Sequence, residues 1–219
     1  MSSGNFKQDV YEQLARVARA IGHANRLELL EFVSQGPRGV DELAAMTRLS
    51  VANTSKHLHE LRRAGLVRAR KEGLRVFYEV AGPDVVELLW ALSAVAESRV
   101  AEVAQLLRTY VTARDDLEPV PATELLQRAK QGLVTVLDVL PPEEYSAGHV
   151  PGAINLTLET LSGHLRRLPK GREVVAYCRG PYCLLSVDAV ALLREKGYKA
   201  RRLEDGFPEW KAAGLPVEA

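Results

Sequence analysis

The chain has 219 residues, of which 47% are hydrophobic, and its 29 basic and 28 acidic residues give a formal net charge of +1. This composition predicts a globular protein of one or two domains. No apolar run is long enough to cross a bilayer, residues 1–10 lack a signal-peptide pattern, and two cysteines are too few for a disulfide framework. We therefore expect a cytoplasmic protein with no membrane partner.

The near-zero net charge conceals a local basic block. Between Arg48 and Arg75 there are eight Lys or Arg residues against two Glu residues. Such a block indicates a polyanionic partner, although solvated basic faces are common.

The first half of the chain has the pattern of a small helical domain with a hairpin. Apolar spacing predicts helices over residues 7–22, 27–33, 40–46 and 50–61. Asp41 and Ser50 are candidate N-caps, and Gly65 ends the fourth helix. Its expected inner face is Val51, Thr54, Leu58 and Leu61. Alternating residues over 66–70 and 75–80, around the turn Lys71-Glu72-Gly73, predict a β-hairpin.

This order is the plan of a winged helix-turn-helix, and residues 8–112 resemble the ArsR family of bacterial repressors. The motifs are His23-Ala24-Asn25-Arg26-Leu27, Ser55-Lys56-His57-Leu58, Leu61-Arg62-Arg63-Ala64-Gly65-Leu66-Val67 and Glu72-Gly73-Leu74-Arg75-Val76-Phe77-Tyr78. The resemblance implies a homodimer bound to double-stranded operator DNA. The candidate DNA-binding residues are Ser50, Asn53, Ser55, Lys56, His57, Arg70, Lys71 and Arg75. Outward Asn53, Lys56 and His57 suit base edges, and the hairpin cations suit phosphates, while the alternative for each is a solvated surface position.

After Gly82-Pro83, a broad apolar stripe predicts one long helix over residues 84–112 that packs partly against a second subunit. Many ArsR proteins bind metals through cysteines before the recognition helix or through His and carboxylates in the terminal helix. Here residues 41–46 contain no cysteine and the long helix contains no histidine, so we expect neither metal site.

Residues 113–121 are charged, contain two prolines and are predicted to form a linker. Beyond them, helices and strands alternate as in a mainly parallel α/β sheet. We expect helices over 122–131, 184–196 and 208–213, and strands over 133–139, 173–177 and 199–203. The predicted fold class is thus two domains: a winged helix-turn-helix of helices plus a wing over 1–112, followed by an α/β domain over 122–219.

Residues 122–219 resemble a single-domain rhodanese, a thiosulfate or persulfide sulfurtransferase. The motifs are Leu137-Asp138-Val139, residues 142–155, Val175-Ala176-Tyr177-Cys178-Arg179, Gly206-Phe207-Pro208-Glu209-Trp210 and Gly214-Leu215-Pro216-Val217. Leu140 and Asp205 depart from the family's usual Arg and Gly. The resemblance implies that Cys178 forms a persulfide, beside Arg179 as a cation for an anionic donor. The other candidate site residues are Gly180, Tyr182, Cys183 and Leu184 in the loop, with Asp138 and His149 in support.

A cysteine between a strand and a helix N-terminus is expected to have a low thiol pKa, with backbone N–H groups around the sulfur. A related phosphatase or arsenate reductase loop would need Arg at the sixth residue after the cysteine, and Leu184 occupies that position. Cys183 can be a resolving thiol that attacks a modified Cys178, or merely a buried cysteine.

Three hypotheses follow. The first is a DNA-binding transcriptional regulator, a repressor, whose affinity for DNA changes when Cys178 is persulfidated or oxidised by a small sulfur donor such as thiosulfate, polysulfide or a persulfide. The second is a sulfurtransferase enzyme tethered to a DNA-binding domain. The third is an inert second domain that only docks a partner. No cofactor and no metal are implied by these motifs.

Overall fold

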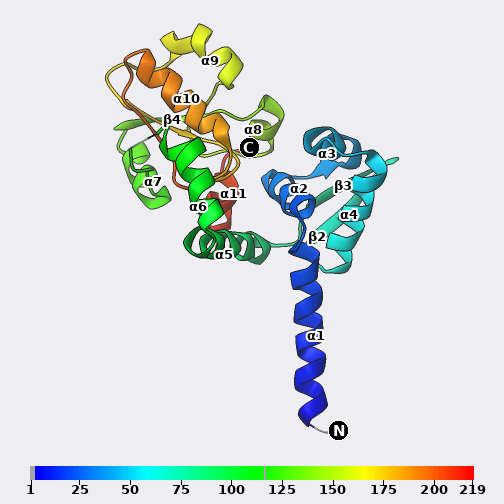
Figure 1. The fold of residues 1–219 in the computed structure, drawn as a ribbon. Coiled ribbons are helices and arrows are strands. Elements are labelled where there is room, and N and C mark those ends of the chain that lie inside the picture. Colours follow the sequence, from blue (N-terminus) through cyan, green and yellow to red (C-terminus); the bar gives the residue numbers. More distant parts are fainter. Residues whose placement is uncertain (1–2, 116) are drawn as a thin grey trace. The chain divides into compact units, whose positions relative to one another are not determined.

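The computed structural model describes residues 3–115 and 117–219, and the chain forms two compact units, Met1–Leu89 and Trp90–Ala219. Figure 1 shows the helices and strands of both units. Each unit is described by itself below. None of the described helices is both long and apolar enough to cross a membrane.

The first unit contains the predicted helices and hairpin. Its elements are α1 (Ser3–Ile21), α2 (Ala24–Gln35), β1 (Arg38–Gly39), α3 (Val40–Thr47), α4 (Val51–Arg63), β2 (Val67–Glu72) and β3 (Arg75–Val80), followed by the start of α5 (Pro83–Arg99). Leu29, Leu30, Leu43, Leu58 and Leu61 are fully buried and form the centre of its core. The helices are therefore held by leucines that face one another, as the apolar spacing predicted.

The start of α4 is fixed by its cap. Ser50 is the N-cap, and its hydroxyl accepts the N–H of Asn53 at 3.3 Å. Gly65, at φ 79°, follows the end of the helix as predicted. One assignment was wrong: Val51, expected on the inner face, is 49% exposed, because the first turn of the helix extends beyond the core.

The turn of the hairpin lies closer to β3 than predicted. β2 continues to Glu72, which pairs with Arg75, so the turn is Gly73-Leu74 and not Lys71-Glu72-Gly73. Gly73 has a φ of +60°, a conformation that suits glycine in a two-residue hairpin turn. The short strand β1 pairs antiparallel with β3 and was not predicted, since two residues carry no periodic signal.

The predicted long helix over 84–112 is interrupted. α5 ends at Arg99, Val100 adopts an extended conformation, and the chain resumes as α6 (Ala101–Leu107) and the π-helical turn η1 (Arg108–Thr112). The apolar stripe continues through the break, which is why the sequence pattern did not reveal it.

The second unit has a four-stranded parallel sheet, which confirms the predicted α/β class. Its strands are β4 (Val134–Asp138), β5 (Ile154–Asn155), β6 (Glu173–Tyr177) and β7 (Ala200–Arg202), in the order β5-β4-β6-β7. The helical segments are α7 (Ala122–Lys130), α8 (Pro142–Ala147), α9 (Leu158–His164), η2 (Leu165–Arg167), α10 (Leu184–Glu195) and α11 (Phe207–Ala212).

The central strand β6 separates two apolar layers. Val174 and Ala176 belong to one buried cluster together with Cys178, whereas Val175 and Tyr177 belong to the other. This alternation is the two-residue period of a strand buried on both faces. It places Cys178 on the same side of the sheet as α10 residues Ala189 and Val190.

Residues 90–121 pack within the second unit. Asp115 is buried and accepts hydrogen bonds from Arg194 at 2.8 Å and Arg202 at 2.7 Å. Val120 is fully buried and forms a bridge with Leu203. The linker predicted over 113–121, in which Asp116 lies outside the described residues, therefore makes fixed contacts with the sheet along part of its length. The domain boundaries given by sequence remain a prediction.

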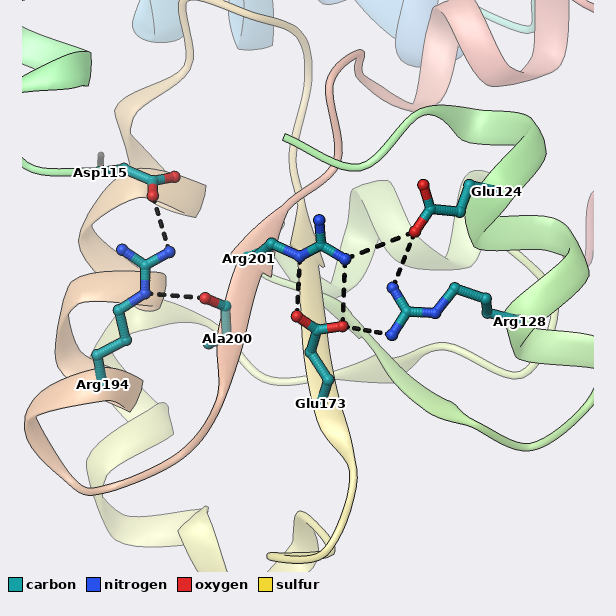
Figure 2. A network of polar contacts seen from close by, with 7 residues as sticks. All are labelled: Asp115, Glu124, Arg128, Glu173, Arg194, Ala200 and Arg201. Carbon is teal, nitrogen blue, oxygen red and sulfur yellow. Dashed lines mark hydrogen bonds and ion pairs between the residues drawn. The ribbon is translucent and has the colours of Figure 1, made fainter. Parts of the chain in front are cut away.

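A second ionic network joins α7 to the strands β6 and β7 (Figure 2). Glu173 receives hydrogen bonds from Arg201 at 2.8 Å and Arg128 at 2.5 Å, and Arg128 also pairs with Glu124 at 3.0 Å. Burial alone would raise the pKa of Glu173, but the two guanidinium groups lower it below its usual value.

Removing the Asp115 carboxylate should destabilise the second unit, because Arg194 and Arg202 would lose their shared buried counter-ion. We expect Asp115→Ala to lower the free energy of unfolding by about 3 kcal/mol. Both tryptophans, Trp90 and Trp210, lie in this unit, so fluorescence during urea unfolding measures the effect. The control is Glu118→Gln at an exposed site of the same segment; equal midpoints for the two variants would contradict the role of Asp115.

Candidate functional site

The cysteine loop joins the central strand to a helix, as the sequence indicated. Cys178 follows the last residue of β6, and Cys183 is the N-cap of α10. Cys178 is 2% exposed, whereas Cys183 is partly exposed. The loop thus holds one buried thiol and one accessible thiol.

The Cys178 sulfur is surrounded by hydrogen-bond acceptors. Its Sγ lies 3.2 Å from the carbonyl oxygen of Cys183, 3.8 Å from that of Gly180 and 3.2 Å from Ser186 Oγ. Carbonyl oxygens accept a proton from a thiol but repel a thiolate. Burial raises the pKa of Cys178 well above its usual value, the neighbouring Cys183 raises it further, and hydrogen bonds from the Ser186 hydroxyl and N–H offset this only in part. The low pKa expected at Cys178 is therefore not found there.

The Cys183 sulfur has the opposite surroundings. The hydrogen bond from the Cys178 thiol lowers the pKa of Cys183 to about 6, against the effect of burial. The backbone N–H groups of Leu185 and Arg179 also lower the pKa of Cys183, and so does the positive charge of Arg179. Cys183 is therefore the residue that carries a thiolate near pH 7.

Arg179 is bound to a buried carboxylate. Its Nε lies 2.9 Å from Glu144 Oε2 and its second terminal nitrogen 2.6 Å from Oε1, and Glu144 is 3% exposed. This bidentate ion pair fixes the loop to α8. It also neutralises the Arg179 charge that was expected to bind an anionic sulfur donor.

The opposite side of the loop is held by a close backbone approach. A Cβ on Gly206 would lie 2.2 Å from the Arg179 carbonyl oxygen, so only glycine fits there. The next residue, Phe207, donates its N–H to the Cys178 carbonyl at 3.1 Å. Glu209 approaches Gly180 from α11, and burial raises the pKa of Glu209 to about 7. Carboxyl groups thus line both sides of the loop.

Of the two supporting residues, Asp138 ends the neighbouring strand β4, and His149 follows α8 and forms an isolated bridge with Glu218. Asp138 is fully buried and accepts the N–H of Leu140 at 2.8 Å, and burial raises the pKa of Asp138 to about 6. His149 stacks on Tyr145 with ring centroids 3.7 Å apart. Leu140, in place of the usual Arg, is 1% exposed and packs in the core.

The remaining loop residues differ in their exposure. Leu184 begins α10, and Gly180 is half-buried. Tyr182 is 44% exposed and donates its hydroxyl to Glu97 at 2.8 Å. Sequence reasoning missed Glu97, Glu144 and Ser186, because neither their spacing nor their residue type marks them as partners of the loop.

In the first unit, most candidate DNA-binding residues are exposed. Asn53, Ser55 and Lys56 lie on the surface of α4, and Arg70, Lys71 and Arg75 lie on the hairpin. Arg70 pairs with Glu72 at 2.6 Å. Ser50 acts as a cap, as described above.

His57 is the candidate that departs most from an outward position. It is half-buried and its ring lies 4.6 Å from that of His23. Burial lowers the pKa of His57, and the nearby His23, Arg26 and Lys56 lower it further. A half-buried imidazole that packs on the N-cap of α2 suits a structural role better than the base contact expected of it.

The part of the chain that the structure describes contains no group of three His, Cys, Asp or Glu side chains placed to hold a metal ion.

Two family models match the chain. The model of the rhodanese-like domain matches residues 121–213, and that of bacterial regulatory proteins of the arsR family matches residues 23–69.

One similar protein spans both halves. HTH-type transcriptional regulator Rv0324 of Mycobacterium tuberculosis is 41% identical over 212 residues, which cover 97% of this chain and 93% of that protein. A sulfurtransferase of Allochromatium vinosum is 33% identical over 87 residues, covering 39% and 79% of the two chains. A solved winged helix-turn-helix domain, the homodimeric fragment 1–100 of Mb0332 from Mycobacterium bovis, is 35% identical, covers 46% of this chain and 91% of its own, and has a TM-score of 0.43.

The two thiols should differ in reactivity. We expect iodoacetamide to modify Cys183 before Cys178, at a rate that rises with pH through about 6 and then levels, because only the thiolate reacts. Peptide mapping by mass spectrometry at short times measures the order. Cys183→Ser should remove the fast phase, and preferential labelling of Cys178 would contradict the assignment.

Proposed function

Because the chain belongs to the ArsR-family HTH-type transcriptional regulators and carries a rhodanese-like domain, we propose that its affinity for operator DNA is set by the sulfur chemistry of Cys178 and Cys183. DNA binding would be strong when both cysteines are reduced and weak when they are modified, as in a repressor. The homodimeric state and the sulfur donor are parts of this proposal.

The observation that carries the proposal is the contact between two differently protonated thiols. Cys178 is a buried thiol whose Sγ lies 3.2 Å from the Cys183 carbonyl oxygen, and its nearness lowers the pKa of the Cys183 thiol to about 6. Thiol–disulfide exchange needs a thiolate that attacks first and a second thiol within reach. This loop provides both within six residues.

The chemistry can be written with a low-molecular-weight persulfide, RS–SH, as the donor. The Cys183 thiolate attacks the outer sulfur, a Cys183–S–SH persulfide forms, and RS⁻ leaves with the electron pair of the broken S–S bond. The Cys178 sulfur then attacks Cys183 Sγ, a Cys178–Cys183 disulfide forms, and the expelled HS⁻ takes the Cys178 proton to become H2S. The donor supplies the oxidising equivalent, and a polysulfide reacts in the same way.

The charges around the loop favour such donors over the thiosulfate dianion. Arg179 is paired with Glu144, and Glu209 and Asp205 lie close to the same loop. An incoming dianion would meet these carboxyl groups, whereas a persulfide or polysulfide carries less charge for each reactive sulfur.

The DNA-binding half would act as a symmetric dimer. Several apolar residues of α1 are exposed, among them Phe6 at 72%, Tyr11 at 55% and Leu14 at 58%. A second copy of the chain would cover them, and two copies of α4 would then meet successive major grooves of a two-fold-related operator.

An alternative function is sulfurtransferase catalysis. It is favoured by the similarity of this half to the sulfurtransferase of Allochromatium vinosum and by the position of Cys178 after the central strand. An enzyme would transfer sulfur from donor to acceptor over many turnovers, whereas a sensor would react once per chain.

The sensing proposal is tested by the affinity of the purified full chain for operator DNA at fixed salt, reduced and after treatment with inorganic polysulfide. We expect affinity to fall at least about fivefold as intact mass shows sulfur addition or loss of two hydrogens. Cys178→Ser should load sulfur on Cys183 but keep its DNA affinity. Release of DNA by treated Cys178→Ser would overturn the proposal.

The DNA surface is tested by two further variants. Arg75→Ala should weaken binding to every sequence alike and reduce the slope of log affinity against log salt by about 1, as expected for a phosphate contact. Asn53→Ala should cost about 1–3 kcal/mol at one operator position. Lys130→Ala, which removes an exposed charge in the second unit, is the control and should change neither quantity.

A further inference from the structure

A cavity of about 260 Å³ lies among α1, α2 and α4 of the first unit, the three helices labelled in Figure 1. Its charged lining residues are Arg16, Arg19, Arg26, Arg63 and Glu60. Four positive charges thus face one negative charge, a net charge of +3. We refer to this site as the arginine cavity. None of its residues has a role in the DNA-binding and sulfur hypotheses above.

Arg26 is held in a fixed position at the cavity. Its Nε donates a hydrogen bond to the carbonyl oxygen of Ala20, and a terminal nitrogen donates to that of Arg19 at 2.8 Å. Both carbonyls belong to the last turn of α1, where the helix dipole favours a cation. A guanidinium group has five N–H donors, more than these two carbonyls occupy. Arg26 is therefore a preorganised cation with donors left for a ligand.

The other cations of the cavity are weakly compensated. Arg63 lies 3.5 Å from Glu60, and both side chains of this pair are largely exposed, so the pair contributes little stability. In the part of the chain that the structure describes, neither Arg16 nor Arg19 forms an ion pair with a carboxylate. Like charges around one cavity repel one another, and a bound anion would relieve that repulsion.

The cavity is of a size for a small ligand. Two of its lining residues, Ala20 and Ala64, have the smallest side chain with a Cβ, which leaves space among the guanidinium groups. The volume of about 260 Å³ is close to the lower end of the range for ligand sites, roughly 300–1,000 Å³. A molecule with one or two phosphate groups fits this space better than a large metabolite does.

The arginine cavity is distinct from the proposed dimer face. On α1, Arg16 and Arg19 follow the exposed Leu14 by two and five residues, roughly half a turn and one and a half turns of helix. They therefore project from the side of α1 opposite to Leu14. A second copy that covers Leu14 leaves these two cations accessible.

The cavity is also distinct from the candidate base contacts. On α4, Glu60 and Arg63 lie in the second half of the helix, whereas Asn53 and Lys56 lie in the first half. The recognition residues can therefore enter a groove while the cavity remains free.

We infer that the arginine cavity binds a small phosphorylated molecule with two or three negative charges. A phosphate group offers three acceptor oxygens in a tetrahedral arrangement, so it can accept hydrogen bonds from guanidinium groups of three helices at once. A planar carboxylate offers only two oxygens. Arg16 of α1, Arg26 of α2 and Arg63 of α4 supply those donors. This inference is independent of the sulfur chemistry of the second unit.

The test is calorimetric titration of the reduced full chain with inorganic pyrophosphate at fixed ionic strength. We expect saturable binding of one pyrophosphate per chain, weakened at least about tenfold in Arg16→Ala and in Arg63→Ala, because each loses a charge-assisted contact. Arg62→Ala is the matched control, since it removes an exposed charge next to Arg63 but outside the cavity lining, and should change affinity less than about twofold. Absence of saturable binding, or an equal loss in Arg62→Ala, would overturn the inference.

The phosphates of DNA have the same chemistry, and the salt dependence of operator affinity distinguishes the two sources. A site for a small ligand predicts that Arg16→Ala leaves the slope of log affinity against log salt unchanged. A slope reduced by about 1, as expected for Arg75→Ala, would assign the cavity to the DNA backbone and refute binding of a small molecule.

The ring of His57 provides a second readout inside the same unit. Burial lowers the pKa of His57, and the charges of His23, Arg26 and Lys56 lower it further. An anion bound beside Arg26 offsets part of this effect, so saturating pyrophosphate should raise the pKa of His57. Titration of the ring protons by NMR, with the signal assigned from His57→Gln, measures the change. An unchanged pKa in the saturated protein would contradict binding at Arg26.

Discussion

The candidate site depends on a loop that is fixed on two sides and adjustable at one position. Gly206 packs against the Arg179 carbonyl, and the Arg179 guanidinium is held by the buried Glu144. These contacts fix the first half of the loop to α11 and α8. The second half, Tyr182–Cys183, is held by a hydroxyl contact to α5 and by the start of α10. A covalent change at sulfur is therefore taken up where the loop is held least, which is beside the accessible cysteine.

The two cysteines show how the same functional group acquires different chemistry five residues apart. Cys178 is buried and faces two carbonyl oxygens, which favours the neutral thiol, and Ser186 opposes this only in part. Cys183 lies at the beginning of a twelve-residue helix, close to backbone N–H groups and a guanidinium, which favours the thiolate. The hydrogen bond between them reinforces the difference, since a proton on one sulfur stabilises the charge on the other. Removal of either thiol therefore changes the protonation of the other.

Much of the fold could be predicted from sequence, but the chemistry of the site could not. The apolar run 173–177 and the periodic residues of 184–196 predicted β6 and α10, because buried strands and amphipathic helices have strong local signals. The two-residue strands β1 and β5 and the break at Val100 have no such signal. Asp115 falls in the predicted linker because its partners, Arg194 and Arg202, lie 79 and 87 residues away along the chain and leave no local signal. Which cysteine is the thiolate depends on where each sulfur points, and spacing alone does not encode that.

The boundary between the two compact units, after Leu89, falls inside α5. Residues 90–121 belong to the unit that contains the cysteine loop, and Asp115 anchors their distal end through Arg194 and Arg202. The first turn of α5 is buried in the cluster that contains Leu58 and Leu61 of α4. A buried ion pair in an apparent linker thus holds the distal end of residues 90–121 against the α/β sheet, because breaking it would leave both guanidinium groups without that carboxylate.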